Sequence, residues 1–302
     1  MIVVFGSIIV DHLFAVPDLP RRGETVLGRQ FSVMAGGKGA NQALAAARDG
    51  APARLVGAVG SDHLAPVALE GLRQAGVDLA GVRRVELPTG AAAIGVDPQG
   101  ENQIMVAAGA NLAASADWLE GALSPGAILL VQRELPQAET ERAIARARAG
   151  GCRVILNLAP ALALAREALR AVDILVVNEV EAASLAGTLG LASADARSLA
   201  QAMDVAAIVT LGAAGAETCA RGRQWRTPAL AVEVADTTGA GDAFVGVLAA
   251  ALDRGLALEQ AVRRACVAGS LSCRATGAQA ALPDGSAIDA ALARLGPDTA
   301  LP

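Results

Sequence analysis

The sequence is poor in the residue types that many binding functions need. It has no Tyr, aromatic residues make up 2% of the chain, and Lys38 is the one lysine among 25 basic residues. So few aromatic rings argue against a nucleic-acid binder that stacks bases on them. The net charge of −5 argues against a basic face for a phosphate backbone. We therefore expect no nucleic-acid partner.

Long apolar runs and metal-type cysteine spacings are also lacking. No apolar run approaches the ~18 residues of a membrane span, and the N-terminus has no positive segment before its short apolar stretch. We expect no transmembrane helix, no signal peptide and no membrane partner. The four cysteines form no C-x-x-C pair and lie apart from both histidines. We expect small buried thiols in a reducing cytoplasm rather than zinc ligands or disulfides.

Short apolar runs alternate with Ala-rich helical segments along most of the chain. The predicted strands are Ile2–Phe5, Arg54–Val59, Ala127–Val131, Arg153–Leu156, Asp173–Val177 and Ala206–Thr210, followed by a strand pair around Glu217–Val234. The predicted helices cover residues 40–48, 63–75, 137–149, 179–187 and 195–202, and residues 240–295 are mostly helical. Nearly continuous apolar strands separated by helices predict an α/β fold with a doubly wound, mostly parallel sheet.

Two segments break this alternation. Residues 10–34 hold short apolar pieces separated by prolines and a glycine, and residues 82–107 resemble strands around a turn at Asp97–Gly100. No linker separates independent domains. We predict one α/β domain over residues 1–302, with a small β appendage formed by these two segments.

The segment Asp236–Phe244 (DTTGAGDAF) carries the sharpest chemical signal. Its glycines lie between an apolar, strand-like run (Ala231–Val234) and an apolar helix (Ala243–Leu252), where backbone N–H groups can face an anion. Asp242 would repel a resting phosphate, but it suits a base that takes the proton of a hydroxyl attacking a phosphoryl group. The alternative is an Asp helix cap beside a glycine turn.

A second glycine-rich segment, Gly36–Gln42 (GGKGANQ), also opens a predicted helix. Its glycines allow a ligand to approach the backbone, and Lys38 and Asn41 add a cation and an amide in the first turn. The spacing is neither that of a P-loop nor that of a dinucleotide fingerprint. The alternative is a glycine-rich turn with an exposed lysine.

The third segment, Gly6–Asp11, follows the first predicted strand. Ligands of open α/β sheets bind at the carboxyl ends of the parallel strands. Asp11 could there accept hydrogen bonds from sugar hydroxyls, although many loops carry an Asp for other reasons.

Together these segments resemble the signatures of the ribokinase (PfkB) family of carbohydrate kinases, and the resemblance extends over nearly the whole chain. Shorter similarities are GETV at 23–26, GENQ at 100–103, GAN at 109–111, TLG at 210–212 and GAQ at 277–279. Within the family the similarity is strongest to its ribose kinases. The resemblance implies an enzyme that uses ATP to phosphorylate the primary hydroxyl of a small sugar, with ribose or 2-deoxyribose as the leading candidates.

The resemblance also implies roles for individual residues. Asp242 matches the catalytic base, and the anion hole is matched by Gly239, Ala240 and Gly241. The residues matched to sugar binding are Asp11, Gly37, Lys38, Asn41, Glu134 and Asp242. Those matched to nucleotide binding are Asn178, Glu181, Thr210, Gly212, Gly215 and Gly241, with Glu181 placing Mg²⁺ through water. A monovalent cation, K⁺, is matched to backbone carbonyls of Asp236, Thr238, Ser272, Ala275 and Gly277.

The β appendage corresponds to the family's lid, which implies a homodimer formed through it. One departure concerns the sugar: Ile9 stands where the family's ribose kinases have Asn. An aliphatic side chain cannot bond a hydroxyl, and burying an unpaired hydroxyl costs about 1–3 kcal/mol. Ile9 therefore favours 2-deoxyribose, unless its side chain faces the core and another group contacts that hydroxyl.

Two other functions stay open at this point. A nucleoside kinase of the same family is disfavoured by the few aromatic rings available for a nucleobase. A catalytically silent sugar-binding regulator on the same fold is disfavoured by Asp242, Gly239 and Gly241, which a sensor does not need.

Overall fold

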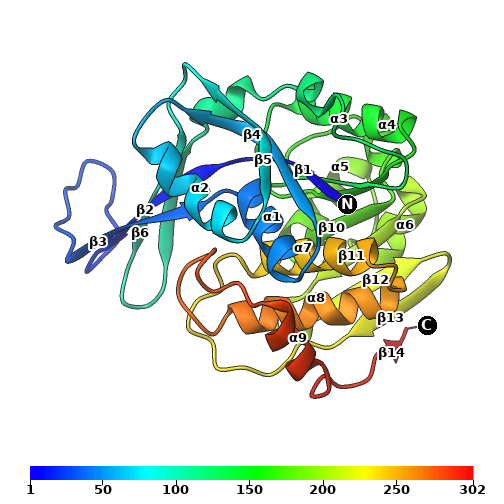
Figure 1. The fold of residues 1–302 in the computed structure, drawn as a ribbon. Coiled ribbons are helices and arrows are strands. Elements are labelled where there is room, and N and C mark those ends of the chain that lie inside the picture. The colour runs from blue at the N-terminus through cyan, green and yellow to red at the C-terminus, as the bar shows by residue number, and fades with distance from the viewer. Residues whose placement is uncertain (302) are drawn as a thin grey trace.

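Two β-sheets organise the chain, of which the computed structural model describes residues 1–301 (Figure 1). The large sheet has the spatial order β14 (Thr299–Ala300), β13 (Arg223–Thr227), β12 (Ala216–Ala220), β11 (Ala206–Thr210), β10 (Ile174–Asn178), β9 (Arg153–Asn157), β8 (Ile128–Val131), β1 (Ile2–Phe5), β4 (Ala53–Gly60) and β5 (Asp78–Val85). Its strands pair in parallel from β11 to β5, and β12, β13 and β14 add an antiparallel edge. The predicted mostly parallel sheet is confirmed.

Helices cover both faces of the large sheet. They are α1 (Lys38–Arg48), α2 (Leu64–Gln74), α3 (Gln137–Ala149), α4 (Arg166–Arg170), α5 (Glu179–Leu189), α6 (Ala196–Met203), α7 (Ala240–Asp253), α8 (Leu258–Ser272) and α9 (Gly285–Leu292), with short 3₁₀ turns at Gly109–Ala113, Ala116–Leu119 and Gly212–Ala214. Strand β1 shows the two layers. Ile2 and Val4 pack with α1, α2, α7 and α8, whereas Val3 and Phe5 pack with α3 to α6. The strand is apolar throughout because both of its faces are buried.

The small sheet projects from one side of this body (Figure 1). Its order is β3 (Gln30–Gly36), β2 (Ile9–Ala15), β6 (Gly90–Val96) and β7 (Asn102–Ala107). Residues 82–85, which we expected in this appendage, lie instead in β5 and pair with β4 of the large sheet. As an edge strand β5 is only half-buried, so its polar composition resembles that of a separate hairpin.

The expected strand at Ala231–Val234 is wrong, because residues 228–235 form neither strand nor helix. Val234 is exposed, and the next N–H groups, of Ala235 and Asp236, both donate to the carbonyl of Cys273 instead of to a sheet partner. A loop tied to the end of α8 therefore leads into α7.

Two smaller observations concern the cysteines and the helices. All four cysteines are free thiols, and three of them are buried. Within residues 1–301, none of the helices combines the length and apolarity needed to cross a membrane.

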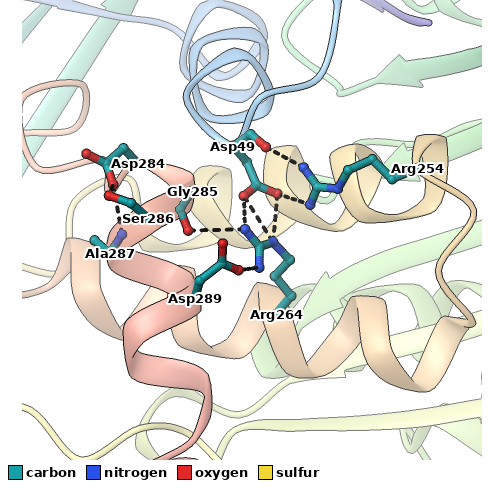
Figure 2. A network of polar contacts seen from close by, with 8 residues as sticks. All are labelled: Asp49, Arg254, Arg264, Asp284, Gly285, Ser286, Ala287 and Asp289. Atoms are coloured by element: carbon teal, nitrogen blue, oxygen red, sulfur yellow. Dashed lines mark hydrogen bonds and ion pairs between the residues drawn. The ribbon is translucent and has the colours of Figure 1, made fainter.

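A buried carboxylate takes part in a polar network that connects four helices (Figure 2). Asp49, at the end of α1, has no exposed side-chain surface. It accepts hydrogen bonds at 3.0 Å from Nε of Arg264 in α8 and at 2.6 Å from Arg254 at the end of α7. Arg264 also contacts Asp289 and the carbonyl of Gly285, both in α9. One carboxylate thus connects the ends of α1 and α7 to the middle of α8, and Arg264 extends the connection to α9.

We expect Asp49→Asn to lower the free energy of unfolding by about 3–5 kcal/mol, since it leaves the buried Arg264 with only the exposed Asp289 as a charged partner. Denaturant titration followed by circular dichroism measures this. The control is Arg73→Ala, which breaks an exposed ion pair with Glu70 and should cost less than about 1 kcal/mol. Equal midpoints for the two variants would show that the buried carboxylate does not stabilise the fold.

Candidate functional site

Polar side chains gather where the parallel strands end. Ser7 follows β1, Glu134 lies three residues beyond β8, and β9 and β10 end at Asn157 and Asn178. The carboxyl ends of parallel strands share one edge of the sheet, which is the edge where open α/β folds bind ligands. Ser7 Oγ donates to Glu134, so two of these strand ends are already joined.

Glycines bring the start of α1 against this edge. A Cβ on Gly39 would lie 2.4 Å from the carbonyl carbon of Gly6, and one on Gly37 would lie 2.7 Å from the nitrogen of Ile9. Gly37 also has a φ of 89°, which L side chains rarely adopt. The close approach lets the backbone N–H of Lys38 donate to Glu134 at 3.1 Å.

Helix α7 starts at the same place from the other end of the sequence. Gly239 is its N-cap with a φ of 78°, and a Cβ there would lie 2.9 Å from Cα of Ala278. Gly241 has open space where its Cβ would be, so packing does not require a glycine there. The N–H groups of Gly239 and Gly241 face outward at the positive end of the helix, whereas that of Ala240 donates to the carbonyl of Thr237 at 3.2 Å.

Asp242 joins the two helix starts. Its side chain is 7% exposed, Oδ2 accepts Nδ2 of Asn41 at 2.8 Å, and Oδ1 accepts Nε2 of Gln42 at 2.8 Å. The segments GGKGANQ and DTTGAGDAF therefore lie next to each other in three dimensions. The structure places Asp242, Asn41, Lys38 and Glu134 in one group.

Three carboxylates act electrostatically on the one lysine or on each other. Asp242 raises the pKa of Lys38 most strongly, against the effect of burial, with smaller contributions from Glu134 and Glu181. Burial, Glu134 and Asp242 together raise the pKa of Asp11 from 3.8 to about 6. The side chain of Asp11 fits only because residue 36 is a glycine, whose Cβ would lie 2.2 Å from Oδ2.

A cavity of about 880 Å³ opens between the small sheet and the segments 234–238 and 276–278. Asp11 is one of its polar walls, and Leu13, Met34 and Ile94 are among its apolar walls. The small sheet therefore covers a hollow whose polar end lies at Asp11.

The residues matched to a monovalent cation lie on two joined segments. Oδ2 of Asp236 accepts the N–H of Gly277 at 2.8 Å, and Oδ1 accepts the N–H of Thr238 at 2.9 Å. Burial works against ionisation of Asp236, but the bonds from Thr238 and Gly277 outweigh it and lower its pKa. Ser272 ends α8 with a buried side chain bonded to the carbonyl of Gly269, and Ala275 lies in the bend that follows.

Asn178 and Glu181 form a capping box at the start of α5. Oδ1 of Asn178 accepts the N–H of Glu181 at 2.8 Å, and the Glu181 carboxylate accepts the N–H of Asn178 at 2.9 Å. Burial raises the pKa of Glu181, and Lys38 and Asp242 also act on it, so this carboxylate faces the same site. The spacing Asn-x-x-Glu therefore has a structural explanation beside the functional one.

The residues matched to nucleotide binding lie next to this cap. Thr210 ends β11 and pairs with Asn178 across the parallel ladder. Gly212 and Gly215 have φ values of 53° and 90° in the turn that follows, and a Cβ on Gly215 would lie 2.0 Å from the carbonyl oxygen of Thr227. Gly215 is thus required by the turn itself.

Sequence reasoning missed four polar residues of this site. Ser7, Gln42, Gln132 and Asn157 are all buried there. The strand-end rule that singled out Asp11 also applies to Asn157. Gln42 lies in a motif that we did select. No local pattern shows that these side chains meet.

Within residues 1–301 the structure contains no group of three His, Cys, Asp or Glu side chains arranged to hold a metal ion.

Comparison with known proteins agrees with the resemblance seen in the sequence. The model of the pfkB family of carbohydrate kinases matches residues 1–285. A ribokinase of Haemophilus influenzae is 35% identical over 291 residues, which cover 93% of this chain and 94% of the relative. A ribokinase structure from Thermotoga maritima has a TM-score of 0.90 at 32% identity and covers 97% and 99% of the two chains. Arabidopsis thaliana ribokinase complexed with ribose and ATP has a TM-score of 0.85 at 31% identity, with 96% and 98% covered.

We expect Asp11→Asn to stabilise the protein at high pH. A carboxyl whose pKa rises from 3.8 in the unfolded chain to about 6 in the folded one favours folding below pH 4, and this contribution is lost as the pH rises through 6. The variant should therefore exceed the wild type by on the order of 1–2 kcal/mol at pH 8 and match it near pH 4.

Denaturant unfolding at the two pH values measures this difference. The exposed Asp18→Asn is the control and should change neither value. A variant of Asp11 less stable than the wild type at pH 8 would contradict the burial argument.

Proposed function

Since the chain belongs to the pfkB family of carbohydrate kinases, we propose that it transfers the γ-phosphate of ATP to the primary hydroxyl of a pentose. The observation that carries this proposal is the Asp242 carboxylate. It is oriented by two amide donors and lies one turn inside a helix whose glycine N-terminus is open to an anion.

In the proposed reaction Asp242 accepts the proton of the sugar hydroxyl. The hydroxyl oxygen attacks the γ-phosphorus, the bond from that phosphorus to the bridging oxygen of ADP breaks, and ADP leaves with the electron pair. The free N–H groups of Gly239 and Gly241 stabilise the charge on the transferred group. Lys38 supplies the one ammonium among the carboxylates of the site.

The sugar would be held by the group around Asp11. Asp11 and Glu134 accept hydrogen bonds from the sugar hydroxyls, and Gly37 lets the sugar approach the backbone. Asn41 adds an acceptor, because its Oδ1 is buried and has no hydrogen-bond partner among residues 1–301. The small sheet would cover the sugar and exclude water, which otherwise hydrolyses ATP without transfer.

ATP would lie along the strand ends β10 and β11, beside Asn178, Thr210, Gly212 and Gly215. A Mg²⁺ ion bound there would neutralise phosphate charge, and Glu181 is the carboxylate placed to hold its water shell. For K⁺, the donors would be carbonyls of the two segments that Asp236 joins, at residues 236–238 and 272–277.

A homodimer through the small sheet is part of the proposal. Phe31 and Met105, both more than half exposed, and the exposed Phe14 lie on the face of its strands opposite to the face that lines the cavity. An apolar patch of this kind is typical of an interface. We place the protein in the reducing cytoplasm, where its four free thiols persist.

The position of Ile9 favours 2-deoxyribose over ribose. Successive residues of a strand face opposite sides, so Ile9 shares a face of β2 with Asp11 and Leu13, which line the cavity. Its neighbours Ile8 and Val10 belong to the hydrophobic core, whereas Ile9 is 5% exposed and packs in none of the core clusters. These observations support a wall of the sugar site rather than a core residue.

The two alternatives are weaker. A nucleoside kinase needs a wall on which a nucleobase can stack, and none of the residues among 1–301 that line the cavity is aromatic. A silent sugar-binding regulator would not need a carboxylate fixed beside an open helix N-terminus.

We expect Asp242→Asn to reduce ADP release in the presence of sugar and Mg·ATP by about 10²–10⁴-fold, the usual contribution of a general base. The affinity for ATP, measured by calorimetry, should change little. The exposed Glu70→Gln is the control. An unchanged rate in Asp242→Asn would refute the assignment of the base.

We expect the wild type to turn over 2-deoxyribose with a higher kcat/KM than ribose, and Ile9→Asn to shift the ratio toward ribose by about tenfold or more. Coupled ADP assays with the two sugars at equal concentration measure the ratio. Ile8→Val, on the core face, should leave it unchanged. A ratio that favours ribose in the wild type would make Ile9 a packing residue, and inosine turnover alone would favour a nucleoside kinase.

A further inference from the structure

A hydrogen-bonded chain of buried side-chain amides leads to the Asp242 carboxylate. Nε2 of Gln42 donates to Oδ1 of Asp242 at 2.8 Å and to Oδ1 of Asn157 at 3.0 Å, and Oε1 of Gln42 accepts Nε2 of Gln132 at 2.6 Å. Asn157 in turn donates to the carbonyl of Val176 at 3.2 Å. The chain therefore runs from the ends of β8, β9 and β10 through α1 to α7.

Gln42 lies at the centre of this chain of amides, and every hydrogen-bonding group of its side chain has a partner. Its side chain is fully buried, both hydrogens of its amide nitrogen are used, and its oxygen has a donor. A flipped amide would direct its oxygen at two acceptors, so the nitrogen must face Asp242. The plane of the carboxylate is thereby fixed to three strand ends.

The packing of α7 on α1 maintains this contact. Gly246 lies four residues after Asp242, on the same face of α7, and a Cβ there would lie 2.5 Å from the carbonyl oxygen of Gln42. At the other end of the amide chain, Gly6 leaves room for Gln132, because a Cβ on residue 6 would lie 2.2 Å from Oε1 of Gln132. Glycine at position 246 therefore lets α7 approach the backbone of Gln42, and glycine at position 6 leaves room for the side chain of Gln132.

A neutral amide suits this position chemically. An arginine or lysine would also orient the carboxylate, but its charge would oppose transfer of a proton to Asp242. An amide orients one oxygen without adding a titrating group. The other oxygen is bonded to Asn41, whose own free acceptor marks the side from which the substrate hydroxyl arrives.

We propose that Gln42 is a positioning residue for phosphoryl transfer, which holds the Asp242 carboxylate in line with the attacking hydroxyl through the amide chain of Gln132 and Asn157. The proposal rests on the proposed function, in which Asp242 is the base. Gln42 itself touches neither the sugar nor the nucleotide. Its removal should therefore lower kcat and leave both KM values nearly unchanged.

The main test is Gln42→Met, which keeps the length of the side chain and removes its hydrogen bonds. We expect kcat with saturating pentose and Mg·ATP to fall by about 10²-fold, the usual effect of misplacing a reacting group by about 1 Å. KM for the sugar and for ATP should stay within about threefold. Thr218→Val, a buried hydroxyl on β12, is the matched control and should keep the wild-type kcat.

Two further variants separate positioning from a purely structural role. Gln42→Glu is isosteric and sets a second carboxylate against Asp242, so the acid limb of its pH profile of kcat should move up by about one pH unit or more. The double variant Gln42→Met with Asp242→Asn should be no slower than Asp242→Asn alone, because Gln42 acts only through the base.

The outcomes are distinguishable. If Asp242→Asn keeps full activity, the proposed function fails at the base. If Asp242→Asn is inactive but folded Gln42→Met keeps kcat within threefold of the wild type, or if the double variant loses activity multiplicatively, only the role of Gln42 is refuted. Should Gln42→Met fail to fold, an unmoved pH profile in Gln42→Glu refutes it equally.

Discussion

The two hydrogen bonds that Asp242 accepts from the beginning of α1 hold the site together, because they join helices that lie 200 residues apart in the sequence. At the opposite ends of the same helices, Asp49 of α1 binds Arg254 at the end of α7. A buried carboxylate therefore connects α1 and α7 at each end of the pair. At the end away from the site, guanidinium groups neutralise the charge of the Asp49 carboxylate. The connection at the site uses amides and leaves the charge available for a proton.

This difference separates stability from function within one pair of helices. Around Asp49 the negative charge is paired with two guanidinium groups. Asp11, Glu134 and Asp242 instead lie together with one ammonium, and the pKa of Asp11 is raised by its burial and then by Glu134 and Asp242. Bound hydroxyls would stabilise these carboxylates by donating to their oxygens. The site is thus built for its occupied state, and the fold around it supplies the stability.

The sequence was informative wherever a pattern is local. The apolar strands predict a sheet buried on both faces, and the glycines of the two motifs predict two helix starts open to ligand. It misled in two places. Ala231–Val234 is mostly apolar but lies in a loop, and the N–H groups that follow it, of Ala235 and Asp236, donate to the carbonyl of Cys273. Residues 82–85 resemble part of the appendage but lie in the edge strand β5. The sequence did not show the contacts of Gln42, which span 115 and 200 residues, because no spacing encodes them.

The single lysine of the chain limits where amine-directed reagents can react with the protein. Apart from the terminal amine of Met1, which is bonded to Asp253, the protein offers one primary amine, at Lys38. The carboxylates around Lys38 keep that amine protonated, so acylating reagents meet a weak nucleophile inside the site. Lysine-directed dyes, cross-linkers and surface coupling would either leave this protein unmodified or label it at Lys38, beside Asp242 and Glu134. Its many arginines give it basic charge without giving it reactive amines.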